Sequence, residues 1–269
     1  MIDDKAFNEL YHPVLIPRTM LKAVKSLLSS AFKKAAGSPL ESVLLSLWLN
    51  HSAFSGLIER SGLPGHAVRN RYGNALILSL PPESLNRMAV FASKHHRRRT
   101  AGVFIWDGDW DRGEAVFRDT DRYALMSDIW ENRQDLRKSR KYTELTEMIK
   151  RGTPYTEFNK NRSGIYLNTE DKVCKYLEIY LKFMQQLEVH GYDTSLEKDP
   201  VCIALDMDGR PVKTAKGLHR LAMAQILGMK SIPVMVRGVH RGWWEKTAGT
   251  EKDNNLKVMR AIEHLRQII

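Results

Sequence analysis

Apolar residues in the last third of the chain recur with the periods of strands and helices. Residues 201–205 alternate small and large apolar side chains, and Asp208-Gly209 then marks a turn. A short second strand follows, and Gly217 opens a helix that ends at Gly228. Residues 232–236, Ile-Pro-Val-Met-Val, have the composition of a further strand. The pattern predicts a strand-turn-strand-helix-strand unit.

Other stretches carry apolar residues at helical spacing, with polar residues on the opposite face. The longest begins at Thr169 and stops before Gly191, and another has Thr19 as N-cap and Gly37 as C′ residue. The predicted helices span residues 19–36, 40–50, 82–94, 123–152 and 169–190. Short strands are predicted at 75–80 and 103–106, and a turn-rich loop at 151–164.

Residues 54–72 form a helix, a Gly-Leu-Pro break and a second helix that carries Arg69 and Arg71. This order resembles a helix-turn-helix, in which the second helix enters the major groove of DNA. A purely structural helical hairpin produces the same pattern. Both interpretations remain open from the sequence.

The densest basic cluster, Lys-His-His-Arg-Arg-Arg-Thr, occupies residues 94–100. Such a cluster attracts phosphates, and contact with nucleic acid or another polyanion would use Lys94, Arg97, Arg98 and Arg99. No aromatic residue is interleaved with these cations, which disfavours stacking on single strands. The alternative is a solvated charged loop.

The composition is that of a folded protein with an anionic partner. The 269 residues are 43% hydrophobic and 27% charged, which excludes wholesale disorder. A formal net charge of +11 favours nucleic acid, a nucleotide, an acidic polymer or an anionic membrane surface. Charge alone does not choose among them.

Cysteine usage and hydropathy indicate the cytoplasm. The two cysteines, Cys174 and Cys202, have no spacing typical of disulfide frameworks or zinc sites, which favours a reducing compartment. The first residues lack the pattern of a secretory signal. No apolar run reaches the roughly 18 residues of a spanning helix.

A candidate anion site lies between the second predicted strand and its helix. Lys216, His219 and Arg220 surround Gly217, which lets a ligand approach the backbone. The start of a helix adds free N–H groups and a partial positive charge, so phosphate is the expected anion. In the structural alternative, His219 and Arg220 only tie the helix end to a carboxylate.

Three carboxylates follow the strand predicted at 103–106. Asp107, Asp109 and Asp111 suit Mg²⁺ or Ca²⁺, or a general base at a strand end. An EF-hand is excluded because Arg112 and Arg118 stand where glycine and glutamate are required. A turn with exposed acids fits equally well. Asp206 and Asp208 are the second choice for a metal ligand or base.

The sequence Gly217-Leu218-His219-Arg220 with the following helix and Ile-Pro-Val strand resembles the ParB/sulfiredoxin-like superfamily. Four further features extend the resemblance to uncharacterised ParB-like proteins: a Gly-Asp-Trp-Asp segment at 108–111, an Arg-Gly-x-Pro-Tyr turn at 151–155, a helix ending in Gly191-Tyr192 and the aromatic-tailed segment 240–244. It covers residues 103–245. It implies a small mixed-sheet core at 101–269, preceded by a mainly helical region at 1–100, within an α/β fold.

The resemblance implies chemistry on nucleotide phosphates. The superfamily includes CTP-hydrolysing DNA clamps, an ATP-using sulfinic acid reductase and amino-acid kinases. Their phosphate-gripping role carries over to Gly217, His219 and Arg220. Leu218 replaces the catalytic cysteine of the reductase, and Lys216 replaces the acid of kinase-type motifs. The chain therefore lacks that nucleophile, and a base at this position is in doubt.

Together these features favour an enzyme that binds ATP, ADP or CTP with Mg²⁺ and acts as a phosphotransferase, similar to a kinase, or as a nucleotide hydrolase on an unknown acceptor. The alternative is a DNA-binding protein using residues 54–72 and 94–99. The catalytic candidates are His219, Arg220, Asp109 and Asp111. The phosphate-binding candidates are Lys216, Gly217, His219, Arg220, His240 and Arg241, and the metal candidates are Asp107, Asp109 and Asp111.

Overall fold

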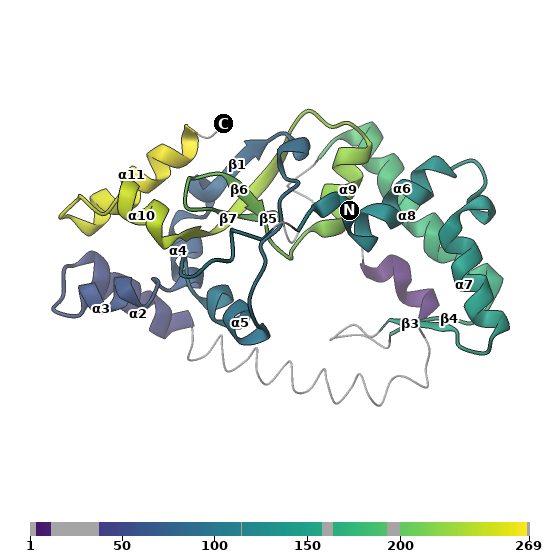
Figure 1. Cartoon of the computed structure of the whole chain (residues 1–269), viewed down its shortest axis with the longest axis horizontal. Helices are drawn as coiled ribbons and strands as arrows, with labels where there is room; N and C mark the ends of the chain where they lie inside the picture. The colour runs from purple at the N-terminus through teal and green to yellow at the C-terminus, as the bar shows by residue number, and fades with distance from the viewer. Residues whose placement is uncertain (1–3, 12–37, 114, 158–163, 193–199, 268–269) are drawn as a thin grey trace. The chain divides into compact units, whose positions relative to one another are not determined.

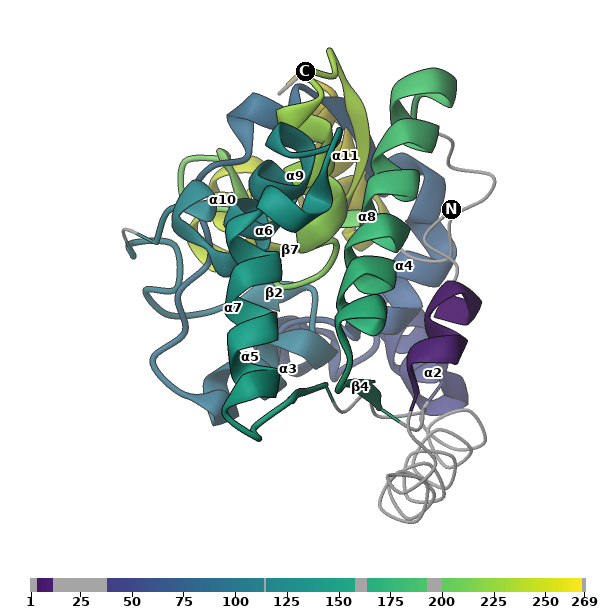
Figure 2. The ribbon, with the colours of Figure 1, turned by 90° about the vertical axis from the view of Figure 1, so that its right-hand side faces the viewer.

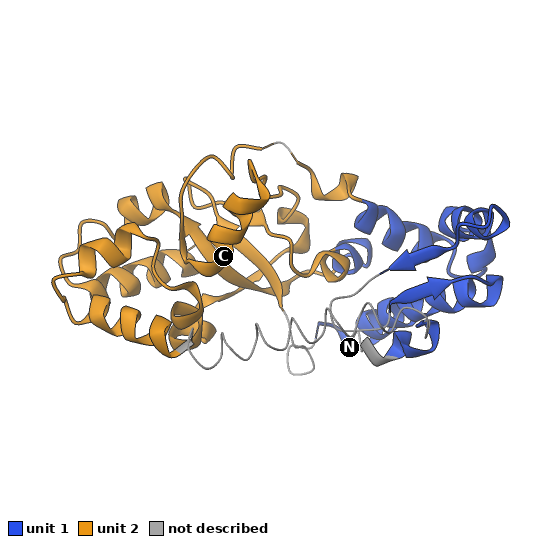
Figure 3. Ribbon diagram, turned by 90° about the horizontal axis from the view of Figure 1, so that it is seen from below, with its two compact units in different colours: residues 1–34, 121–197, 222–228 blue, residues 35–120, 198–221, 229–269 orange. Residues whose placement is uncertain are grey.

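The structure, a computed structural model, describes residues 4–11, 38–113, 115–157, 164–192 and 200–267 (Figure 1). It has an α/β fold, and the chain divides into two compact units built from several segments each. Unit 1 comprises residues 1–34, 121–197 and 222–228, and unit 2 comprises 35–120, 198–221 and 229–269 (Figure 3). The domain boundary predicted at residue 100 falls inside helix α5 (Lys94–Gly102), and both sides belong to unit 2.

Unit 1 is built around the long helix α8 (Glu170–His190), which Figure 2 shows beside α7. Thr169 caps its start by accepting a hydrogen bond from the Lys172 N–H, and Gly191 follows its end with φ 70°. The helix predicted at 169–190 is confirmed. The other elements are η1 (Asp4–Leu10), α6 (Asp121–Glu131), η7 (Leu136–Lys138), α7 (Arg140–Lys150), β3 (Tyr155–Glu157) and β4 (Ile165–Leu167).

The core of unit 1 is aromatic. Phe7 of η1 lies with its ring centroid 5.4 Å from Tyr180 and 6.1 Å from Tyr176, both on α8. Burial raises the pKa of Tyr176 well above its ordinary value, so its hydroxyl stays protonated. β3 lies within the turn-rich loop predicted at 151–164, and it pairs antiparallel with β4, which follows that loop.

Unit 2 contains a mixed sheet centred on β7 (Ile232–His240). Strand order is β1-β7-β5-β6, with β2 (Ile105–Trp106) also paired to β7. β5 (Val201–Leu205) and β2 run parallel to β7, whereas β1 (Ile77–Leu80) is antiparallel to it. β6 (Pro211–Lys213) is antiparallel to β5 across the turn at Gly209, φ 82°. The strand-turn-strand-helix-strand prediction for 201–236 is confirmed, with α9 (Leu218–Ile226) as the helix.

Helices of unit 2 meet at a half-buried carboxylate. Glu59 of α3 (Ser55–Arg60) accepts hydrogen bonds from Trp48 Nε1 at 3.1 Å, Trp244 Nε1 at 2.9 Å and Lys257 Nζ at 2.8 Å. Burial alone raises the pKa of Glu59, but these hydrogen bonds outweigh it and leave the pKa lowered. One side chain thereby joins α3 to α2 (Ser38–Leu49), α10 (Arg241–Thr247) and α11 (Asn254–Arg266).

The remaining elements of unit 2 are α4 (Gly65–Tyr72), η4 (Gly73–Leu76), η5 (Pro82–Ser84) and η6 (Phe117–Asp119). The helix predicted at 40–50 is confirmed by α2. α2 packs on both α3 and α4, which supplies a supporting helix for the helix-turn-helix-like segment. Gly62 and Leu63, with φ 109° and 56°, make the turn between α3 and α4.

Three local predictions are wrong. The helix predicted at 123–152 is two helices, α6 and α7, because residues 132–139 between them form turns and η7. Residues 82–94 form only the short η5, because the backbone of 87–90 bonds to other segments: Met88 N–H donates to Ala115 O, and Ala89 N–H donates to Lys213 O. Residues 94–100 are helical rather than a loop, because Ser93 accepts a hydrogen bond from the His96 N–H as N-cap. The helix predicted at 19–36 lies outside the described residues.

Within the described residues, no helix is both long and apolar enough to cross a membrane.

Candidate functional site

A buried lysine underlies the predicted anion loop. The side chain of Lys213, at the end of β6, is 0% exposed. Its Nζ donates to three backbone carbonyls, Cys202 O at 3.2 Å, Thr214 O at 2.5 Å and Lys216 O. Three acceptors match the three N–H bonds of an ammonium group. Burial lowers the pKa of Lys213 to about 7.

These contacts orient the backbone of residues 214–217. In a planar trans peptide the C=O and the following N–H point in opposite directions. The carbonyls of Thr214 and Lys216 face Lys213 Nζ, so the N–H groups of Ala215 and Gly217 are directed away from it. Two N–H groups directed outward from one loop, at alternate residues, are donors for an anion.

Gly217 requires the absence of a side chain. Its φ is 77°, and a Cβ there would lie 2.9 Å from Val201 Cα. Lys216 beside it is exposed, whereas His219 and Arg220, in the first turn of α9, are half-buried. The local arrangement predicted for Lys216, Gly217, His219 and Arg220 is therefore present, on one loop and the helix that follows.

The carboxylates predicted to complete this site lie at the other end of the sheet. Gly217 abuts Val201, the first residue of β5, whereas Asp206 follows the last. At about 3.3 Å per residue, β5 separates its two ends by about 13 Å. Asp107 follows β2, and His240 ends β7; both strands are parallel to β5. The β5–β6 hairpin returns the chain to the first residue of β5, so residues 214–220 and the acids at 107–111 lie at opposite ends of that strand.

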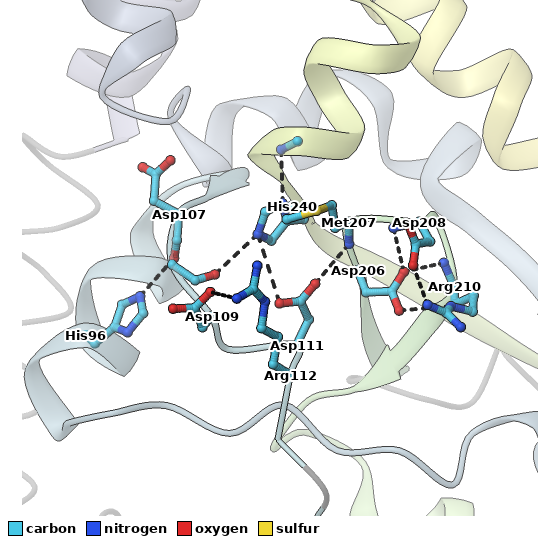
Figure 4. A network of polar contacts seen from close by, with 12 residues as sticks. His96, Asp107, Asp109, Asp111, Arg112, Asp206, Met207, Asp208, Arg210 and His240 are labelled. Carbon is cyan, nitrogen blue, oxygen red and sulfur yellow. Dashed lines mark hydrogen bonds and ion pairs between the residues drawn. The ribbon is translucent and has the colours of Figure 1, made fainter.

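Asp111 and His240 lie close together near the ends of the parallel strands β2, β5 and β7 (Figure 4). They are 6% and 7% exposed. His240 Nδ1 accepts a hydrogen bond from the Gly242 N–H at 2.9 Å and so caps α10. The proton of the neutral ring therefore resides on Nε2, which donates to Gly108 O at 3.2 Å and lies 4.0 Å from Asp111 Oδ1. In this tautomer the Nε2–H of His240 is used by Gly108 O and makes no hydrogen bond to the carboxylate.

Asp111 is held mainly from the other side. Its Oδ2 accepts a hydrogen bond from the Met207 N–H at 2.9 Å, and its carbonyl accepts one from Arg87 at 2.7 Å. Within the described part of the chain, Oδ1 is buried without a hydrogen-bond donor, as is Trp110 Nε1 without an acceptor. The Trp110 and His240 rings lie 6.0 Å apart.

The neighbouring acids pair with separate arginines (Figure 4). Asp109 and Arg112 are exposed and 3.1 Å apart, and Asp208 pairs with Arg210. Asp107 pairs with Arg241, and this hydrogen bond raises the pKa of the guanidinium. Arg241 also donates to Arg60 O at 2.9 Å.

The acids at 107–111 do not converge on a common point. Asp107, Asp109 and Asp111 have the three different sets of partners given above. Among residues that the structure describes, no three His, Cys, Asp or Glu side chains are grouped so as to hold a metal ion.

Asp206, the second choice from the sequence, is more enclosed than Asp109 or Asp107. It is 2% exposed, and its carboxylate accepts hydrogen bonds from the N–H groups of Asp208 and Arg210 and from Arg87 at 2.8 Å. These contacts close the Asp208-Gly209 turn and attach the segment around Arg87 to the end of β5. The role that the structure gives Asp206 is to hold this turn.

Two residues with structural roles here, Lys213 and Arg87, have no recognisable signal in the sequence. A single lysine at the end of a short strand carries no distinctive signal, because its partners are backbone carbonyls. Arg87 lay in a predicted helix, where its contacts with Asp206 and Asp111 could not be anticipated.

Comparison of the chain with protein-family models, curated proteins and solved structures finds no match to any of them.

Proposed function

We propose that this protein is a nucleotide-phosphate-binding enzyme that grips phosphate at residues 214–220. The observation that carries the proposal is the set of hydrogen bonds from Lys213 Nζ to backbone carbonyls, called here the Lys213 brace. It directs the N–H groups of Ala215 and Gly217 outward at the start of α9. Lys216 adds an exposed positive charge to the same loop. Backbone donors, a helix N-terminus and a cationic side chain are together the components of a phosphate site.

The reaction class rests on the resemblance to nucleotide-using proteins of the ParB/sulfiredoxin-like superfamily. A phosphotransferase, similar to a kinase, or a nucleotide hydrolase needs cationic groups on the phosphoryl oxygens. Both Arg220 and His219 are in the first turn of α9. In the proposed enzyme Arg220 would supply a fork of donors to phosphate, and His219 would donate or shuttle a proton. Mg²⁺ would enter with the nucleotide, since such ions bridge phosphate oxygens.

The loop site does not include the acids at 107–111 or the pair His240–Arg241. Each of these lies at the far end of β5. A catalytic or metal-binding role of Asp107, Asp109 or Asp111 would therefore need a ligand that extends along the strand. Phosphate binding is the part of the proposal that this chain's geometry supports directly.

The test is thermal unfolding with ATP, ADP and CTP, each with and without Mg²⁺. A ligand at a hundred times its Kd stabilises the folded state by about 2.7 kcal/mol, so the unfolding temperature should rise. Arg220→Ala and Lys216→Ala should abolish the rise. Lys230→Ala, an exposed lysine beyond the end of α9, is the matched control and should retain it. An unfolding temperature that no nucleotide changes would overturn the proposal.

A further inference from the structure

Helix α5 of unit 2 carries an unusual concentration of uncompensated positive charge. Its exposed cationic or titratable side chains are Lys94, His95, Arg97, Arg98 and Arg99. Within the described residues, none of these five side chains makes a hydrogen bond or an ion pair. Other cations of unit 2 have carboxylate partners, such as Arg87 with Asp206 and Lys257 with Glu59. α5 is therefore a basic surface that the fold does not neutralise.

This arrangement opposes the stability of the helix. Lys94 is the first residue of α5, where the partial positive charge of the helix N-terminus repels a cation. Lys94 and Arg98 are also spaced i,i+4, so like charges face each other. No acidic residue occurs in the nine-residue helix.

Two other contacts hold α5 in place. Ser93 caps its start, and His96 Nε2 contacts Asp107 O at 3.0 Å. The helix is thus fixed by neutral contacts while its cations remain in solvent. Repulsion between these cations destabilises α5, yet the helix is held in place. This combination fits an anionic partner that neutralises the cations when it binds.

We propose that α5 binds double-stranded nucleic acid through the phosphates of its backbone. An arginine guanidinium matches phosphate oxygens with paired donors, and three consecutive arginines offer several such contacts. α5 has no aromatic side chain on which bases of a single strand could stack. It also has no apolar face of the kind that inserts into a lipid surface. A duplex backbone is the polyanion that fits a helix of this composition.

The neighbouring helix α4 carries one further exposed arginine. Pro64, before α4, pairs with Val103, after α5, so the two helices meet there. Arg71 of α4 is exposed, with its guanidinium 5.8 Å from the Tyr72 ring. Arg69, by contrast, is half-buried beside Arg237, and burial together with that like charge lowers the pKa of Arg69 to about 10. Arg71 rather than Arg69 is the α4 residue available to phosphate.

Binding should be independent of base sequence and steeply dependent on salt. Contacts to phosphates position a protein without reading bases. Five cations, Arg71, Lys94 and Arg97–99, give a slope of log K against log salt of about −4.5. Affinity for a duplex should then fall about 500-fold between 50 and 200 mM salt.

The experiment measures fluorescence anisotropy of a labelled 24-base-pair DNA duplex over a salt series with the full chain. The test variant carries Lys94→Gln, Arg97→Gln, Arg98→Gln and Arg99→Gln. The control carries Lys138→Gln, Lys150→Gln, Arg151→Gln and Lys182→Gln, four exposed cations of unit 1 that remove the same net charge. Duplex RNA, single-stranded DNA and anionic lipid vesicles complete the panel.

In the test variant the slope of log K against log salt should become less steep by about 3.6, because four phosphate contacts are removed. The control should keep most of the original slope. The test variant should also unfold at the same or a higher temperature, because repulsion within α5 is removed, and this separates lost binding from lost folding. Equal duplex binding by the two variants, tighter binding of single strands or vesicles than of duplex, or no duplex binding at 50 mM salt would each overturn the proposal. The nucleotide-induced rise in unfolding temperature should survive in the test variant, so the two proposals fail separately.

Discussion

The replacement Lys213→Met tests the buried brace through the pH dependence of stability. In the folded chain the pKa of Lys213 is lowered to about 7, against an ordinary value of 10.5. Between these values the unfolded state binds the proton and the folded state releases it, so the free energy of unfolding rises with pH. Below pH 7 Lys213 is protonated in both states, so it no longer makes the free energy of unfolding depend on pH. Methionine fills a similar volume without a titrating group.

The magnitude follows from linkage. One pKa unit corresponds to about 1.36 kcal/mol, and a pKa of about 7 in the folded state gives a rise of about 2.5 kcal/mol between pH 6 and pH 9. The assay is urea unfolding of the original protein and of Lys213→Met at pH 6, 7.5 and 9. Other titrating groups occur in both proteins, so their effects cancel in the difference. Parallel pH profiles for the two proteins would refute a titrating, buried Lys213.

The other predictions concern single backbone or capping positions. In a urea titration, Gly217→Ala should lower the free energy of unfolding by at least about 2 kcal/mol, because a Cβ at positive φ would also approach Val201 too closely. The control Gly228→Ala, at φ 61° with open space around it, should lower it by about 1 kcal/mol. Gly238→Ala should cost about 1–3 kcal/mol by calorimetry, since its Cβ would overlap the Trp106 indole; a neutral result would contradict the packing of β2 on β7. His240→Ala should cost about 1 kcal/mol through loss of the α10 cap, and His240→Asn should restore most of it; equal losses would disprove the capping role.

Local periodicity predicted the elements between residues 201 and 236 best, because their turns were unambiguous. Alternation predicted the strand at 201–205, and glycines marked the turn and the start of α9. The structure gives the reason for these glycines, since Gly209 and Gly217 have φ of 82° and 77°. The segment 82–94 failed because its backbone pairs with Ala115 and Lys213, contacts that helical spacing cannot reveal. Tertiary hydrogen bonds there outweighed local preference.

For the candidate site too, sequence patterns predict contiguous residues but not the proximity of residues that are far apart in the chain. Residues 216–220 were recognisable because they are contiguous and follow a strand. Their separation from Asp107, Asp109 and Asp111 depends on the direction of β6, and nearness in sequence to β5 does not show at which end a loop emerges. The proximity of Asp111 to His240 depends on β2 and β5 both running parallel to β7, which only the pairing of distant segments decides.

The central position of β7 has a consequence for synthesis of the protein on the ribosome. Its partners β1, β2 and β5 all precede it in the chain, so β7 is the last strand of this sheet to be translated. About 150 residues separate β1 from β7, which corresponds to about 10–30 s at usual elongation rates. Until then β1 and β5 present unpaired strand edges, which other chains can join. Nascent chains that stall before residue 232 should therefore aggregate or require chaperones, whereas completed chains can close the sheet.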